Sequence, residues 1–268
     1  MTSRWPICFS RLWGRLATCG PIFNRSIRAQ PGRVSATFLL ILTAVPMLAS
    51  SVTGKIELRD SREASVRKRL DYSGVVISLV SLNKPTNHQA DIHVRMLQKN
   101  KMFTPHILAI ASGTYVDFPN DDPIFHSAFS SYDAEIFDVG LYAPGTSKSV
   151  QFTRPGVVRV FCNIHSSMSA VIIVLSTPYF STTGRDGSFQ IPNVPPGEYQ
   201  LTVFHERATE TTLNALARRV TVEQAALALS PIVISEAGFL QMPHNNKYGH
   251  VYAPPTDDHS IYPAAKKE

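Results

Sequence analysis

The sequence predicts an all-β protein. Between residues 52 and 235, short runs of alternating or β-branched apolar residues recur, a pattern that is typical of strands. Turn-forming clusters such as Pro144-Gly145, Pro155-Gly156 and Gly184-Arg-Asp-Gly187 separate these runs. Many short strands at this spacing indicate a β-sandwich or barrel, and a Greek-key arrangement is the one we expect.

The individual elements follow from the local patterns. Residues 52–58 and 92–97 alternate polar and apolar side chains, which predicts strands. Residues 209–219 carry apolar side chains at helical spacing, which predicts a short amphipathic helix. The other expected strands are residues 74–80, 103–110, 114–118, 149–152, 157–161, 170–175, 188–191, 199–204, 220–222 and 231–235.

Residues 1–51 are predicted to be a signal peptide. They contain six arginines and no lysine, aspartate or glutamate, and an apolar stretch at residues 34–48 precedes the small residues Ala49, Ser50 and Ser51. A transmembrane helix needs roughly 20 apolar residues, and this stretch is shorter and contains Pro46. We therefore expect cleavage and an exported, periplasmic location, with membrane attachment only if the leader is retained.

The basic charge of the chain belongs to this leader. The whole sequence has 26 basic and 20 acidic residues, and without the six leader arginines the two numbers are equal. Nucleic-acid binding requires a basic surface on the folded part of a protein. We therefore expect no nucleic-acid partner.

The segment Cys162-Asn-Ile-His165-Ser-Ser-Met168 carries the candidate site. It lies between two expected strands, so one short loop presents a thiolate, an imidazole and a thioether. A second imidazole, that of His126, follows another expected strand on a loop and completes a set of four donors. Two histidines, one cysteine and a weak axial methionine are the ligands of a mononuclear blue-copper electron-transfer site.

Cysteine usage favours metal binding by Cys162. The other two cysteines, Cys8 and Cys19, lie in the leader, so an exported protein keeps one thiol and forms no internal disulfide. A lone cysteine in an oxidising compartment is reactive, intermolecular or bound to something else. The alternatives are a buried core cysteine with Met168 as core filler, and a zinc site with Asp121 or Asp122 as fourth ligand.

The remaining histidines have simpler interpretations. We expect His93 to be exposed on its strand, and His106 and His205 to have structural, hydrogen-bonded roles. Residues 237–268 are rich in proline, tyrosine, histidine and asparagine, which predicts an extended or disordered tail. The tail histidines, which would be solvated or would scavenge copper weakly, are His244, His250 and His259.

Residues 91–176 resemble the cupredoxins, the plastocyanin-like blue-copper proteins. The resemblance depends on Gly113-Thr-Tyr-Val-Asp-Phe118, on Asn120-Asp-Asp122 before the first histidine, and on the Cys-x2-His-x2-Met loop, which is similar to that of amicyanin. Plastocyanin-like and methylamine-utilization proteins are similar over nearly the whole exported chain. The resemblance implies one type 1 copper held by His126, Cys162, His165 and Met168.

One residue departs from the cupredoxin pattern. Ser127 stands where many members have an asparagine that braces the two ligand segments. The resemblance therefore implies that the hydroxyl of Ser127 or the side chain of Asn163 supplies the hydrogen bond to the cysteine sulfur. It also implies that the apolar side chains which exclude water from the site are Phe118, Phe125, Phe129, Phe161 and Ile164, and that the edge of His165 reaches the surface.

The flanking residues 52–90 and 177–236 resemble a carboxypeptidase-regulatory-like β-sandwich. The resemblance depends on the turn–strand–turn segment that starts at Gly184-Arg-Asp-Gly187 and continues through Pro195-Pro-Gly197. Because residues 91–176 already supply a full cupredoxin strand set, we predict that they are inserted into this second sandwich.

The expected function is an exported one-electron carrier that cycles between Cu(II) and Cu(I) and exchanges electrons with redox partner proteins. The sequence shows no nucleophile elbow, phosphate loop or second copper cluster, so we expect neither an enzyme nor a small-molecule substrate. Two alternatives remain: a copper-binding or delivery protein without redox turnover, and a structural interaction module of the cell envelope.

Overall fold

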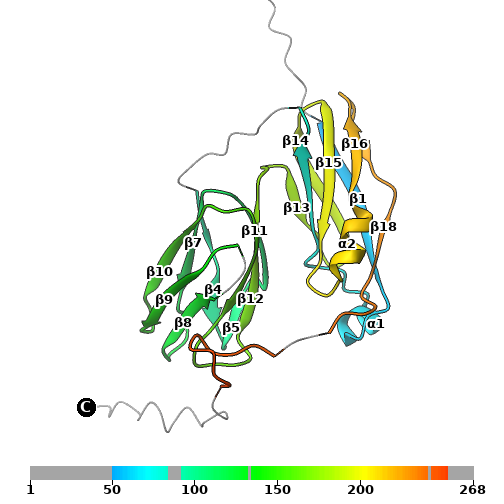
Figure 1. The fold of residues 1–268 in the computed structure, drawn as a ribbon. Helices are drawn as coiled ribbons and strands as arrows, with labels where there is room; N and C mark the ends of the chain where they lie inside the picture. Colours follow the sequence, from blue (N-terminus) through cyan, green and yellow to red (C-terminus); the bar gives the residue numbers. More distant parts are fainter. Residues whose placement is uncertain (1–49, 84–91, 132–133, 241–242, 253–268) are drawn as a thin grey trace, which may run out of the picture. The chain divides into compact units, whose positions relative to one another are not determined.

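The computed structural model describes residues 50–83, 92–131, 134–240 and 243–252 (Figure 1). The predicted leader lies outside these residues except for Ser50 and Ser51, which are part of the first strand. His259 also lies outside them. Within the described residues, no helix is both long enough and apolar enough to cross a membrane.

The prediction of an all-β sandwich protein is confirmed. The described part contains two short helices, α1 (Ala64–Arg69) and α2 (Glu210–Leu216), and its other regular elements are all strands. Helix α2 falls inside the predicted helix, and the side chain of Thr209 caps it by accepting a hydrogen bond from the Thr212 backbone N–H.

Strands from both ends of the described chain form one pair of sheets, which we call the flanking sandwich. Strand β1 pairs with β14, β17 and β18 in one sheet, and the order of the other sheet is β13-β2-β15-β16. Their apolar faces share one buried cluster that includes Ile56, Leu79 and Leu201. The strands are β1 (Ser50–Arg59), β2 (Val76–Ser81), β13 (Phe180–Thr182), β14 (Ser188–Val194), β15 (Gly197–Phe204), β16 (Arg218–Val222), β17 (Leu227–Ala228) and β18 (Ile232–Ser235).

The chain between β2 and β13 forms the central sandwich. Its sheets have the orders β6-β12-β11-β8-β9 and β10-β7-β3, together with the β4-β5 hairpin. This is the chain order that an inserted sandwich requires, while the exact limits of the two domains stay predictions. The strands are β3 (His93–Arg95), β4 (Leu97–Lys99), β5 (Met102–Thr104), β6 (Ile107–Ala111), β7 (Thr114–Pro119), β8 (His126–Ser130), β9 (Phe137–Tyr142), β10 (Ser147–Phe152), β11 (Gly156–Phe161) and β12 (Ser169–Leu175).

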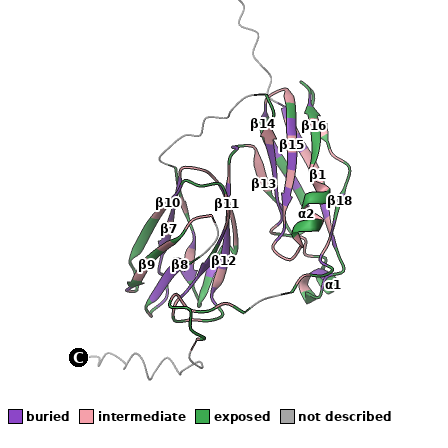
Figure 2. Cartoon of the chain, viewed as in Figure 1, coloured by how far each residue is buried: buried purple, intermediate pink, exposed green. Residues whose placement is uncertain are grey.

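Aromatic side chains fill the core of the central sandwich. The ring of Phe137 lies 5.8 Å from that of Phe118 and 5.5 Å from that of Phe152, measured between centroids. Burial of one such side chain stabilises the fold by roughly 1.5–3 kcal/mol. Cys162 and Met168 belong to the same buried cluster. Strand β12, which directly follows Met168, is buried along most of its length (Figure 2).

Two strands of the central sandwich were not expected from the sequence. Strand β8 carries His126 as its first residue, where we expected a loop, and all five of its residues are buried. Strand β9 pairs with it antiparallel, with His126 opposite Tyr142.

We expect Gly187→Ala to destabilise the flanking sandwich strongly. Gly187 has a φ of +77°, and an added Cβ would clash with the backbone carbonyl oxygen of Ile56. The strained φ and the backbone clash together should lower the free energy of unfolding by about 3 kcal/mol, measured by urea denaturation. Gly145→Ala is the control, because its φ of +72° is similar and no atom lies within 4 Å of the added Cβ. The control should lose about 1 kcal/mol, and equal losses in both variants would contradict the assigned clash.

Candidate metal centre

The loop that carries Cys162, His165 and Met168 is closed at its base by strand pairing. Strands β11 and β12 are antiparallel neighbours, and Phe161 pairs with Ser169 directly before and after the loop. Within the loop, the backbone N–H of Cys162 donates to the carbonyl of Met168, and that of Met168 donates to the carbonyl of His165, both at 3.1 Å. These hydrogen bonds therefore fix the backbone positions of Cys162, His165 and Met168, from which the three side chains extend.

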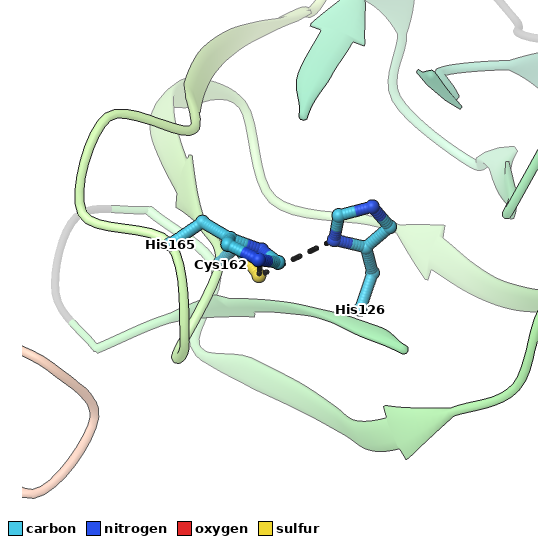
Figure 3. Close-up of side chains that lie close together, drawn as sticks. All are labelled: His126, Cys162 and His165. Carbon is cyan, nitrogen blue, oxygen red and sulfur yellow. Dashed lines mark hydrogen bonds between the residues drawn. The ribbon is translucent and has the colours of Figure 1, made fainter. Parts of the chain in front are cut away.

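The structure brings His126 to this loop from the neighbouring strand. Strand β8 pairs with β11, with Phe129 opposite Phe161. The Sγ atom of Cys162 lies 3.9 Å from Nδ1 of His126 and 3.6 Å from Nδ1 of His165 (Figure 3). One donor atom from each of the three side chains lies within 4.8 Å of the others. Three of the four predicted ligands thus form one cluster.

Burial differs among the four predicted ligands. Cys162, His126 and Met168 are completely buried, whereas His165 is partly exposed. His165 therefore reaches the surface in part, and the exposed imidazole edge that we expected there stays a prediction. Met168 packs in the same core cluster as Cys162, and its role as an axial ligand stays a prediction.

The surroundings of Cys162 favour the thiolate. Burial alone raises its pKa, but hydrogen bonds from His126 and His165 and from the backbone outweigh burial and lower the pKa to about 5. The thiolate is the form of cysteine that binds metal ions. Burial lowers the pKa of His126, yet its contacts with Cys162 and with Asp122 raise it above its ordinary value. Both shifts favour an arrangement of thiolate beside imidazole, and metal binding to such groups is pH-dependent.

Asp122 orients the ring of His126. Its Oδ2 atom lies 2.7 Å from Nε2 of His126, on the side of the ring opposite to Nδ1. The same carboxylate accepts hydrogen bonds from the backbone N–H groups of Asn100 and Lys101 at 2.6 and 2.9 Å. A carboxylate that holds the outer nitrogen of a histidine fixes the direction in which the other nitrogen points. Here it directs Nδ1 of His126 toward Cys162.

This role of Asp122 was not evident from the sequence. We considered Asp121 and Asp122 only as a fourth ligand of zinc, and neither belongs to the cluster of donor atoms in the described residues. Burial alone would raise the pKa of Asp122. Hydrogen bonds from the backbone N–H of Lys101 and from the ring of His126 outweigh burial and lower the pKa below its ordinary value, so the carboxylate is ionised at neutral pH. These partners occupy both oxygens of the carboxylate, which argues against Asp122 as a fourth ligand.

Asn120 fixes the segment between β7 and His126. It is fully buried, and its Nδ2 donates to the carbonyl of Ile124 at 2.8 Å, while its Oδ1 accepts from the N–H of Asp122 at 3.1 Å. The resemblance pointed to Asn120 as a landmark but assigned it no role. Its contacts show that it shapes the turn that delivers Asp122 and His126.

Ser127 connects strand β8 to the ligand loop. Of the two groups that we expected near the cysteine sulfur, the hydroxyl of Ser127 is the one that lies there. Its hydroxyl lies 3.8 Å from Sγ of Cys162 and accepts a hydrogen bond from the Asn163 backbone N–H at 2.8 Å. The side-chain oxygen of Asn163 is used elsewhere, because it accepts from the N–H of Lys247. The serine therefore takes the bracing position, and the side chain of Asn163 does not.

We expect Ser127→Ala to weaken the connection between strand β8 and the ligand loop. The N–H of Asn163 loses its acceptor, which should lower the free energy of unfolding by about 1–3 kcal/mol. Urea denaturation of the metal-free chain measures this loss. Ser166→Ala is the control, since Ser166 is exposed in the same loop; a loss of the same size there would contradict the assigned bridge.

The expected apolar surroundings are only partly buried. Phe118, Phe129 and Phe161 are buried. Phe125 and Ile164, which directly precede the two ligand histidines in the chain, are 37% and 41% exposed. That these two side chains help to exclude water from the site stays a prediction.

The histidines outside the cluster follow most of our expectations. His93 is exposed beside Asp117, Nδ1 of His106 lies 3.1 Å from the carbonyl of Ser169, and His205 is buried against Glu236. The prediction of a solvated His244 is wrong. Its ring stacks on Phe161 with centroids 4.0 Å apart, because residues 243–252 pack against the ligand loop.

The comparisons with known proteins give similarities of partial extent. No protein-family model and no curated protein matches the sequence. Among solved structures, the chain is similar to a purple cupredoxin from Nitrosopumilus maritimus, at 22% identity and a TM-score of 0.29 over 32% of this chain and 100% of that chain. It is similar to a copper-containing nitrite reductase from Thermus scotoductus SA-01, at 26% identity and a TM-score of 0.29 over 36% of this chain and 25% of that chain.

A reduced amicyanin variant is similar at 16% identity and a TM-score of 0.30, over 38% of this chain and 99% of that chain. All three similarities leave more than half of the chain uncovered. The case for a bound metal therefore depends on the donor atoms of the site itself.

Proposed function

We propose that this protein binds one copper ion as a type 1 centre and carries single electrons. The observation that supports the proposal most strongly is the placement of the Cys162 sulfur within 3.9 Å of two imidazole Nδ1 atoms, with Cys162 and His126 fully buried. Thiolate and imidazole donors suit copper, and a buried thioether nearby suits a weak axial position. The proposed ligands are His126, Cys162, His165 and Met168.

A bound copper ion would supply one-electron chemistry between Cu(II) and Cu(I). The residues of the chain fit this use, because the loop that carries three of the donors and the ring of His126 are held by contacts that need no metal. Strand pairing closes the ligand loop, Asp122 holds His126, and Ser127 joins the loop to strand β8. A site that keeps its geometry in both oxidation states needs little rearrangement during electron transfer. The partly exposed ring of His165 is the proposed route for electrons to a partner protein.

Zinc fits the described donors less well. A structural zinc site has four strong ligands, usually cysteine, histidine or carboxylate. The described cluster has three such donors, and Asp122 is occupied by His126 and two backbone N–H groups. The donor set therefore favours copper over a closed zinc site.

The cellular setting completes the proposal. The leader would direct export to the periplasm, where Cys162 as the one cysteine after cleavage would remain available for metal. The flanking sandwich, a proposed carboxypeptidase-regulatory-like module, would act as scaffold or docking module for redox partner proteins. A copper-delivery protein without redox turnover would use the same ligands, and the experiment below separates the two.

Titration of the purified chain with Cu(II) tests the proposal. We expect uptake of one copper per chain and an intense visible thiolate-to-copper band that disappears on reduction and returns on oxidation. A colourless protein that binds only Cu(I) would support delivery instead. Absence of stoichiometric copper uptake would refute both metal functions.

A further inference from the structure

Residues 243–252, which we call the strap, lie against the ligand loop without forming a helix or strand. The strap has an internal turn: the side chain of Asn246 accepts from the N–H groups of Tyr248 and His250, and the N–H of Asn246 donates to the carbonyl of His250. These bonds give the segment a defined local shape.

The strap contacts Phe161, the last residue of β11, and the first two residues of the ligand loop, Cys162 and Asn163. The ring of His244 stacks on Phe161, with an interplanar angle of 19°. The hydroxyl of Tyr252 donates to the carbonyl oxygen of Cys162 at 2.8 Å. The contacts therefore include the backbone of the residue that supplies the thiolate.

Further contacts attach the middle of the strap. The backbone N–H of Lys247 donates to Oδ1 of Asn163 at 3.0 Å, and its ammonium group lies 2.7 Å from Oδ2 of Asp138 on strand β9. The rings of His244 and Tyr252 also contact each other edge to face, at 5.2 Å between centroids. The two aromatic side chains thus form one small cluster over Phe161 and Cys162.

The strap contacts the peptide group between Cys162 and Asn163, which takes no part in the hydrogen bonds within the loop. The bonds inside the loop use the N–H of Cys162 and the carbonyls of His165 and Met168. The carbonyl of Cys162 instead accepts from Tyr252. The peptide that follows Cys162 is thus held from one side by Ser127, through the N–H of Asn163, and from the other side by the strap.

We infer that the strap is a positioning element of the metal centre, in which Tyr252 and His244 hold residues 161–163 so that the Cys162 thiolate faces the two imidazoles. The holding of the loop is a property of the metal-free chain. Its effect on a bound copper rests on the proposed function.

Hydrogen–deuterium exchange of the metal-free, full-length chain tests the inference. Tyr252→Phe removes one hydrogen bond and keeps the ring, and a neutral hydrogen bond contributes about 0.5–1.5 kcal/mol, which corresponds to an exchange rate about 2- to 12-fold faster. We expect this acceleration in peptides that cover residues 161–168. His244→Ala should accelerate exchange there to a similar extent through loss of the ring stack.

Tyr248→Phe is the matched control, because this tyrosine lies in the same strap and is 68% exposed. It should leave exchange in the ligand loop unchanged. Unchanged exchange in both Tyr252→Phe and His244→Ala would overturn the inference, as would equal acceleration in the control.

The copper-loaded variants supply a second readout that a merely structural contact would not move. A loosened loop admits water, which favours the more highly charged Cu(II), so we expect a lower reduction potential and an altered thiolate-to-copper band in Tyr252→Phe but not in Tyr248→Phe. If the wild-type chain takes up no copper, the proposed function fails, while the exchange data still decide the role of the strap. If copper binds and loop exchange is unchanged in the variants, only the strap inference fails.

Discussion

Cys162→Ser should abolish the visible thiolate-to-copper band completely and reduce copper binding to the level of weak surface sites. Serine is nearly isosteric with cysteine, but its hydroxyl stays protonated at neutral pH, whereas the surroundings of Cys162 lower the thiol pKa to about 5. The variant therefore loses the anionic donor and keeps the shape of the site. Absorption spectroscopy after addition of Cu(II) measures the result.

The fold must survive for this result to be informative. The loop-closing backbone hydrogen bonds between Cys162 and Met168 do not involve the thiol, so we expect the far-ultraviolet circular dichroism of the metal-free variant to match the wild type. A variant that is folded and still blue after copper addition would show that the ligand assignment is wrong.

Asp122→Asn should weaken copper binding by roughly 10- to 100-fold, the usual cost of removing a carboxylate that orients a metal-binding histidine. The amide keeps the size of the side chain but has no negative charge to hold Nε2 of His126, which lies 2.7 Å from the carboxylate. The buried amide also has one oxygen to share between the Asn100 and Lys101 N–H groups. Competition with a chelator of known copper affinity measures the change.

Asp121→Asn is the control for this prediction. Asp121 is the preceding residue, it is exposed, and it lies outside the donor cluster. Its substitution should leave copper affinity unchanged. Equal weakening by both substitutions would indicate a general effect of negative charge near the site, and Asp122 would then have no special orienting role.

The sequence predicted the strands that carry strong local patterns. Strands β11 and β12 are apolar and rich in β-branched residues, so both their positions and the short loop between them were evident. Strand β8 was missed because His-Ser-Ala-Phe-Ser contains few residues with high strand propensity. Its neighbours β9 and β11 pair with it on both sides, and this tertiary context outweighs the weak local preference.

In the candidate site, too, the features with a local sequence pattern were predicted, and those that depend on distant residues were not. Cys162, His165 and Met168 were recognisable because their spacing is local, and His126 was added because it completes the donor set of a blue-copper site. The role of Asp122 was not recognisable, since it depends on the turn at Asn100 and Lys101, more than twenty residues earlier in the chain. The strap contacts span still greater separations, with 90 residues between Tyr252 and Cys162, and no local pattern encodes them.

The strand order of the flanking sandwich has a consequence for how the chain reaches its folded state. Strand β1 pairs in parallel with β18, and the hydroxyl of Ser61 donates to Glu236, 175 residues away. All strand pairs of the central sandwich, by contrast, form between residues 93 and 175. Because closure of a long loop costs entropy before its contacts form, we expect the central sandwich to fold first. Strands β1 and β2 have no pairing partners until the segment that forms β13–β18 has been synthesised. During this interval their unpaired edges expose the newly made chain to aggregation and proteolysis.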